Sequence, residues 1–153
     1  MSISRKAIWI FSIAAIVAIG TLTLNSCVAS AGVIHVPGDY ATIQQAINAV
    51  DPDNRTIEVN ATTYTAKETI DVTQPNIIIR SVNGRAVIDA NGTDDHVVDI
   101  TDQTNVTLEG FEIRDAHGTT QNVAGIYMYN ATNCKIVNNV ITNISANGSI
   151  KPQ

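Results

Sequence analysis

The feature that most constrains this chain is an internal repeat with a period of 28 residues. The segment from Val97 to Ile113 and the segment from Gly125 to Ile141 follow the same order of apolar and polar residues, at an offset of 28 positions. A weaker copy begins at Ile70, and its second half is offset by 29 positions. A repeat of roughly twenty to fifty residues is typical of proteins in which equal structural units stack on one another.

Each copy contains two short runs of β-branched residues that alternate with polar ones, separated by a polar turn around an Asn. This alternation predicts β-strands, and neither run has room for a helix of about ten residues. Stacking the copies aligns apolar side chains into four columns, which are Ile70 with Val98 and Ile126, Val72 with Ile100 and Met128, Ile77 with Val106 and Cys134, and Ile79 with Leu108 and Ile136. Such columns, about 4.8 Å from rung to rung, fill the interior of a parallel β-helix. We therefore predict an all-β solenoid of few coils.

One segment before the repeats has helical periodicity, and it follows a predicted strand at Val33–Val36. Its apolar residues recur at helical spacing and are Ile43, Ala46, Ile47 and Val50. Thr42 and Gln45 form a capping box, and Pro52 ends the segment. We expect this helix to cover the open apolar end of the first coil, whose first strand is Thr56–Asn60.

The first 31 residues have the pattern of an export signal. Arg5 and Lys6 precede an apolar run from Ala7 to Leu24, and the small residues 29–31 form a cleavage site. The alternatives are an uncleaved membrane anchor and lipid attachment at Cys27. The predicted organisation is a signal at 1–31, an N-terminal cap at 32–55, β-helix repeats at 56–144 and a tail at 145–153. A secreted or cell-surface location follows.

Composition narrows the possible partners. The net charge is −5, and no cluster of Lys and Arg marks a nucleic-acid site. Cleavage of the signal would leave Cys134 as the single cysteine, so no internal disulfide is expected, and its column predicts a small buried side chain. Membrane contact is expected only through the first segment.

Two motifs together resemble a known superfamily. Residues 40–47, Tyr-Ala-Thr-Ile-Gln-Gln-Ala-Ile, are followed by strand pairs such as residues 105–111, Asn-Val-Thr-Leu-Glu-Gly-Phe. This combination resembles the right-handed parallel β-helix superfamily, the pectin-lyase-like fold, over about Val33 to Ile144. Within it, the chain looks most like surface β-helix proteins and like the carbohydrate-binding and sugar-hydrolase domain of a periplasmic nitrous-oxide-reductase maturation family. The resemblance implies the fold and leaves the activity open, because members include lyases, esterases, hydrolases, epimerases and non-enzymatic surface proteins.

Two outward carboxylates are the candidates for chemistry. Asp71 and Asp99 occupy the same outward column in adjacent coils, where they could share a proton or bind Ca²⁺. Tyr127 follows them in that column and interrupts the row of acids. We assign no catalytic residue, no metal and no cofactor, with Ca²⁺ as the alternative. The histidines His96 and His117 lack a fixed ligand spacing.

A second outward group fits carbohydrate. Tyr127 and Tyr129 point outward from one strand, beside Asp99 and Thr101 on the preceding coil. Exposed aromatic rings stack on sugars, although β-propensity alone also places Tyr on strands. We predict that these four residues form a flat glycan-binding strip.

Turns and asparagines give further expectations. Asn83-Gly84 and Asn91-Gly92 predict turns, and residues 115–122 predict a polar loop that carries His117. Asn76, Asn105 and Asn133 hold equivalent turn positions. We expect a ladder in which each amide bonds backbone in the next coil, burying Asn105 despite its sequon. The glycosylation candidates are Asn54, Asn60, Asn91, Asn130, Asn143 and Asn147.

Three functions remain open. The favoured one is an exported, non-catalytic surface module that binds glycan or supports the envelope. The second is a polysaccharide-active enzyme of lyase or epimerase type, or a truncated remnant of one, and the third is a maturation or assembly factor. No cap is evident beyond Ile136, Val140 and Ile141, so we also expect edge-to-edge self-association.

Overall fold

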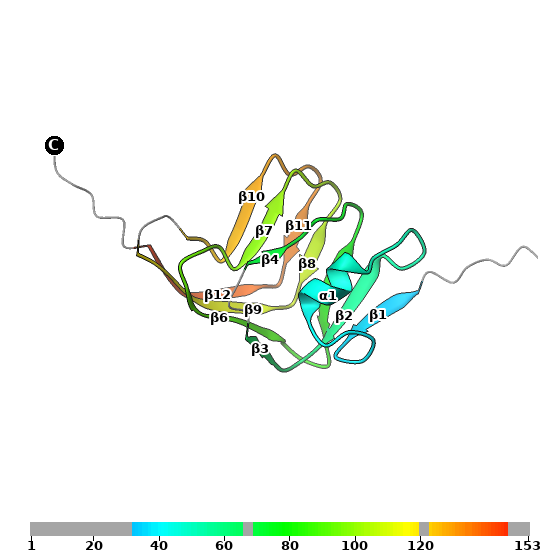
Figure 1. The fold of residues 1–153 in the computed structure, drawn as a ribbon, viewed down its shortest axis with the longest axis horizontal. Helices are drawn as coiled ribbons and strands as arrows, with labels where there is room; N and C mark the ends of the chain where they lie inside the picture. The colour runs from blue at the N-terminus through cyan, green and yellow to red at the C-terminus, as the bar shows by residue number, and fades with distance from the viewer. Residues whose placement is uncertain (1–31, 66–68, 120–122, 147–153) are drawn as a thin grey trace, which may run out of the picture.

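The computed structural model describes residues 32–65, 69–119 and 123–146. Within them the chain is all-β with one short helix, and every strand pairing is parallel (Figure 1). Sheet A contains, in spatial order, β1 (Val33–Val36), β2 (Thr56–Asn60), β5 (Ile78–Val82), β8 (Thr107–Glu109) and β11 (Lys135–Val137). Sheet B contains β3 (Thr63–Thr65), β6 (Val87–Thr93), β9 (Glu112–Gly118) and β12 (Val140–Ala146). Sheet C contains β4 (Ile70–Asp71), β7 (Val98–Thr101) and β10 (Ile126–Tyr129).

The chain visits the three sheets in a fixed order. From β2 onward, successive strands belong to sheets A, B and C in turn, and the cycle then begins again. Each strand therefore lies beside its counterpart from the previous cycle, as Figure 1 shows for β4, β7 and β10. This all-β, parallel arrangement is compatible with a β-helix-like solenoid.

The strand register confirms the repeat that the sequence predicts. Ile126 lies beside Val98, which lies beside Ile70, and Ile136 lies beside Leu108, which lies beside Ile79. Side chains alternate between the two faces of a strand. One correct pairing therefore determines whether each of the other residues on the paired strands points inward or outward. The predicted columns of outward residues are confirmed in the same way, with Asp71, Asp99 and Tyr127 in successive rungs.

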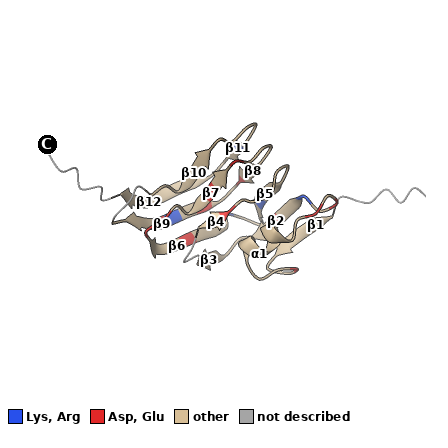
Figure 2. Cartoon of the chain, turned by 45° about the horizontal axis from the view of Figure 1, so that its top comes forward, with Lys and Arg blue, Asp and Glu red and all other residues tan. Residues whose placement is uncertain are grey.

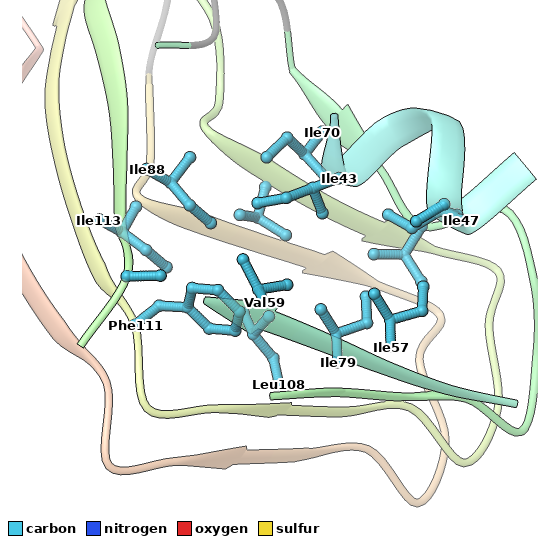
Figure 3. Packing of buried hydrophobic residues seen from close by; sticks show 14 of the residues in the cluster. Ile43, Ile47, Ile57, Val59, Ile70, Ile79, Ile88, Leu108, Phe111 and Ile113 are labelled. Carbon is cyan, nitrogen blue, oxygen red and sulfur yellow. The ribbon is translucent and has the colours of Figure 1, made fainter. Parts of the chain in front are cut away.

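The interior is apolar throughout the described residues. Its largest fully buried side chains come from all three sheets and from the helix. They include Ile100 and, as Figure 3 shows, Phe111, Ile47, Ile57, Ile88 and Leu108. No polar or charged side chain among the described residues is buried. Burial of these side chains is the dominant stabilising term, because each contributes roughly 1.5–3 kcal/mol relative to exposure.

The helix α1 (Ile43–Asn48) begins where the capping motif predicts. The Thr42 hydroxyl oxygen accepts a hydrogen bond from the Gln45 N–H at 3.2 Å. Ile43, Ala46 and Ile47 are buried, and α1 contacts β1, β2 and β4, of which β1 and β4 are edge strands. Figure 3 shows Ile47 directed toward Ile57 and into the core. The first strand in sheet A is β1, so Thr56–Asn60 is the second strand of the stack and not the first.

The corners between sheets use asparagine and aspartate. All ten non-glycine residues with a positive φ in the described part of the chain are Asn or Asp, and their φ values lie between 48° and 63°. These two residues tolerate the left-handed region because their short side chains bond locally. Seven of the ten lie between strands of different sheets, whereas Asn91, Asp115 and Asn143 lie within strands. The corners therefore account for most of these residues.

Two predicted loops are strand residues instead. Asn91 and Gly92 lie within β6, where their positive φ values of 52° and 77° coincide with a shift of register between Asp89 and Thr93. This is a β-bulge, which the same dipeptide chemistry permits. Asp115 and His117 lie on β9, because the φ of 63° at Asp115 bends the strand without ending it. Residues 120–122 of the predicted loop lie outside the described residues.

The two ends of the stack differ. At the end formed by β10, β11 and β12, three apolar side chains that continue core columns are exposed by 38–48%, and they are Met128, Ile136 and Ile141. Cys134 is only half-buried for the same reason, although it packs against the core. The prediction that Cys134 is buried is therefore wrong, because no further described coil lies over it.

We expect the chain to self-associate through this end in a concentration-dependent way. A second copy offers matching apolar columns and unpaired strand edges, whereas α1 covers the opposite end. Ile141→Lys should shift the equilibrium toward monomer, measured by sedimentation velocity across a concentration series. Ile78→Lys is the control, because Ile78 is 39% exposed on the outer face of a central strand. A native chain that stays monomeric at high concentration would contradict the expectation.

Some predictions lie outside the described residues, namely the export signal at 1–31 and the sequon at Asn147. Among residues 32–65, 69–119 and 123–146, no helix has the length and apolarity that crossing a bilayer requires.

Candidate functional site

The outer face of sheet C brings together all four residues of the predicted strip. Tyr127 lies beside Asp99, and Tyr129 lies beside Thr101, because β10 and β7 pair in parallel register. Asp71 on β4 lies beside Asp99 on its other side. The face therefore has a carboxylate end and an aromatic end, and Figure 2 shows acidic residues on β4 and β7.

A shallow hollow of about 300 Å³ occupies the carboxylate end of this face. It is lined by Asp71, Val72, Thr73, Asp99, Thr101 and Gln103. The Thr101 hydroxyl donates to Asp99 Oδ1 at 2.5 Å, and the Gln103 side-chain amide donates to the Thr101 carbonyl at 3.2 Å. These bonds hold polar groups in place at the surface, where sugar hydroxyls can both donate to and accept from them.

The aromatic end is ordered by a stacking contact. The rings of His96 and Tyr127 are parallel within 1°, with centroids 4.2 Å apart. His96 Nδ1 accepts a hydrogen bond from the Ala124 N–H at 3.0 Å, which fixes the imidazole. One face of Tyr127 is thereby covered, and its side chain is 37% exposed, whereas Tyr129 is 62% exposed. Tyr129 is the more open platform for a ligand.

At the edge of this face next to the helix, the Gln44 side chain bonds the backbone of β4. Gln44 of α1 donates from Nε2 to the Asp71 carbonyl at 3.0 Å and accepts from the Asp71 N–H at 2.8 Å. The Gln44 amide thus makes the two backbone hydrogen bonds that a further strand would otherwise make to the edge strand β4. The sequence did not indicate this contact, since Gln44 belongs to a different element 27 residues earlier.

The other titratable candidates serve structure. Arg114 on β9 donates to Asp89 on β6 at 3.0 Å and also pairs with Glu112 and Asp115. Hydrogen bonding to Asp89 raises the pKa of Arg114. His117 bonds Ser145 at 2.7 Å, far along the chain from His96. In the described part of the chain, no group of three or more His, Cys, Asp or Glu side chains is placed to hold a metal ion.

The predicted asparagine ladder is present between Asn76 and Asn105, and its geometry differs from the prediction. Asn76, Asn105 and Asn133 all have positive φ, and Asn105 Nδ2 donates to Asn76 Oδ1 at 2.7 Å. The bond joins two side chains, and all three residues are exposed, so the predicted burial of Asn105 is wrong. The predicted bonding to backbone is made elsewhere: the Asn139 amide accepts from the Phe111 N–H at 2.9 Å and donates to the Leu108 carbonyl at 2.8 Å.

Several sequon amides are already engaged. The Nδ2 of Asn130 donates to Asp102 at 2.7 Å, that of Asn143 donates to Asp115, and that of Asn54 donates to Asp51 at 3.1 Å. Glycan attachment at Asn130 or Asn143 would replace one of the two N–H groups of an amide that bonds the neighbouring coil. Asn60 differs, because its Oδ1 accepts from Asn83 Nδ2 at 2.8 Å.

Comparisons of the chain with family models, with curated proteins and with solved structures found no match. A functional assignment must therefore be supported by the arrangement of side chains on these sheets.

Proposed function

We propose that this chain is an exported right-handed parallel β-helix with an N-terminal capping helix, and that it binds glycan at the cell surface through the outer face of sheet C. The observation that carries the proposal is the register of β4, β7 and β10, which gathers Asp99, Thr101, Tyr127 and Tyr129 on one face. Right-handedness is what parallel strand crossovers adopt in nearly all cases.

The face is suited to an extended sugar chain. Neighbouring rungs lie about 4.8 Å apart and every second residue of a strand points outward, which gives a regular lattice. The open ring of Tyr129 offers an apolar surface for a sugar ring, while Asp99 and Gln103 offer hydrogen-bonding groups beside it. Affinity should be weak, because a shallow face removes little of the ligand from water.

The test is loss of glycan retention on replacing both tyrosines. The full chain with Tyr127→Ala and Tyr129→Ala should lose binding on a glycan array while its thermal unfolding changes little, because both rings lie outside the core. The single change at Tyr129 should cost more affinity than that at Tyr127, one face of which is covered by His96. Tyr40→Ala is the matched control, since Tyr40 is also 37% exposed but lies before α1. Unchanged retention by the double variant would place the binding site elsewhere.

A second candidate function is polysaccharide cleavage or epimerisation. The adjacent carboxylates of Asp71 and Asp99, which both line the 300 Å³ hollow, favour it. Acid–base chemistry on a sugar uses such a pair when one carboxyl holds a proton and the other does not. If the native chain depolymerises an acidic polysaccharide and Asp99→Asn abolishes that activity, the enzyme assignment replaces the binding assignment.

A further inference from the structure

A groove of about 590 Å³ runs along the corner between sheets C and A, away from the strip of sheet C. One wall is formed by Asn76, Asn105 and Asn133, of which Asn76 and Asn105 are joined by a side-chain hydrogen bond that begins a ladder. The other is formed by the first outward residues of three neighbouring strands, Ile78, Thr107 and Lys135, which lie side by side in register. The groove therefore consists of two parallel columns of three residues each, and Cys134 completes its lining.

The ladder keeps hydrogen-bonding capacity for a ligand. A primary amide has two N–H donors and a carbonyl with two lone pairs, and the Asn105–Asn76 bond uses one donor of Asn105 and one lone pair of Asn76. The remaining groups face solvent, because all three asparagines are exposed. Their backbone is fixed in the left-handed region, so the amides are held at regular intervals before any ligand arrives.

The charge in the groove is a single ammonium. Lys135 is exposed, and among the described residues it takes part in no ion pair, whereas Arg80 in the same sheet is paired with Glu58 at 2.5 Å. The protein as a whole is acidic, with a net charge of −5, and repels anionic ligands in general. The ammonium of Lys135 attracts an anionic group to the groove in particular. The exposed Ile78 adds an apolar contact at the far end of the same column.

We propose that this groove binds an anionic polysaccharide lying along the stack, with hydroxyl groups bonded to the asparagine amides and one carboxylate or sulfate held by Lys135. Successive rungs lie about 4.8 Å apart, so the hydrogen-bonding groups of the groove form a regular row along which an extended chain can lie. The volume lies within the range of about 300–1,000 Å³ that ligand sites occupy.

The experiment measures binding of the full chain to three probes by titration calorimetry: oligogalacturonate for carboxylate, dextran sulfate for sulfate, and neutral dextran. Lys135→Gln should weaken binding of the preferred anionic probe about tenfold, the value of one charge-assisted hydrogen bond. The native affinity should fall with added salt, and the variant should lose most of that dependence. Asn105→Gly keeps the positive φ and removes the amide, so it should weaken binding without unfolding the corner.

Two control variants distinguish this groove from the rest of the protein surface. Arg80→Gln removes the same charge from the same sheet outside the groove, and it should bind like the native chain. Tyr127→Ala with Tyr129→Ala should also retain anion binding, which separates this site from the sheet C strip. The proposal is overturned if neither anionic probe binds, if neutral dextran binds equally, if Arg80→Gln is as weak as Lys135→Gln, or if Asn105→Gly binds like the native chain.

Discussion

Ile47→Asp should lower the melting temperature by roughly 10–20 °C, or prevent folding altogether. Ile47 lies on the buried side of α1, and its side chain is fully buried. It belongs to the helix that packs on the end of the stack formed by β1 and β4. The substitution removes an apolar side chain and places a carboxylate where no described polar group could receive it. The cost should be at least about 4 kcal/mol, because an unpaired charge in an apolar interior has no compensating interaction. Thermal unfolding followed by circular dichroism measures it.

The matched control lies one residue further along. Asn48→Asp introduces the same charge on the exposed side of α1 and keeps an acceptor for the Gln44 amide, which bonds Asn48 Oδ1 at 3.1 Å. Its cost should be at most about 1 kcal/mol, from the unfavourable position of a carboxylate at a helix C-terminus. Equal melting temperatures for the Ile47 and Asn48 variants would show that α1 does not contribute to the core.

Phe111→Ala should destabilise the chain by about 3–5 kcal/mol. Phe111 is fully buried immediately before β9, and Figure 3 shows its ring among Leu108, Val59 and Ile113. Its neighbour on the previous coil is Ala86, which is also fully buried, so the large ring occupies space that the small side chain leaves.

Chemical denaturation measures this cost, and Phe111→Leu is the companion variant. Leucine retains most of the apolar volume, so it should cost clearly less than alanine. The Phe111 backbone is also held by Asn139 and Arg85, and these bonds remain in both variants. A loss below about 1 kcal/mol for the alanine variant would mean that the ring is not part of a tightly packed core.

The elements of the fold that the sequence predicts are those set by periodicity. The columns through Ile70 and Ile79, the helix at Ile43 and the outward position of Tyr127 follow from two simple repeats, alternation along a strand and 28 residues between coils. Both repeats can be recognised from the order of apolar and polar residues alone, so no side-chain conformation needs to be known.

The contacts that the sequence does not predict depend on side-chain conformation across coils. One such contact is the bond from Gln44 to the edge strand β4, and another is the stacking of His96 on Tyr127. Each joins residues about one coil apart and requires a particular rotamer. The exposure of Asn105 is of the same kind, because the left-handed corner turns its amide outward to the ladder. At Asn91 the sequence predicts a turn where the structure has a bulge, because bulges and turns use the same residues.

The exact register between coils limits how this protein can change in length. Removing residues 98–125 would place Ile126 where Val98 now stands, directly beside Ile70, and each inward residue would again meet an inward residue. Removing a single residue from β7 would instead shift the alternation by one position and turn Ile100 toward water. Insertions and deletions of whole coils should therefore be tolerated, whereas a change of one residue within a strand should be as damaging as the loss of a core side chain.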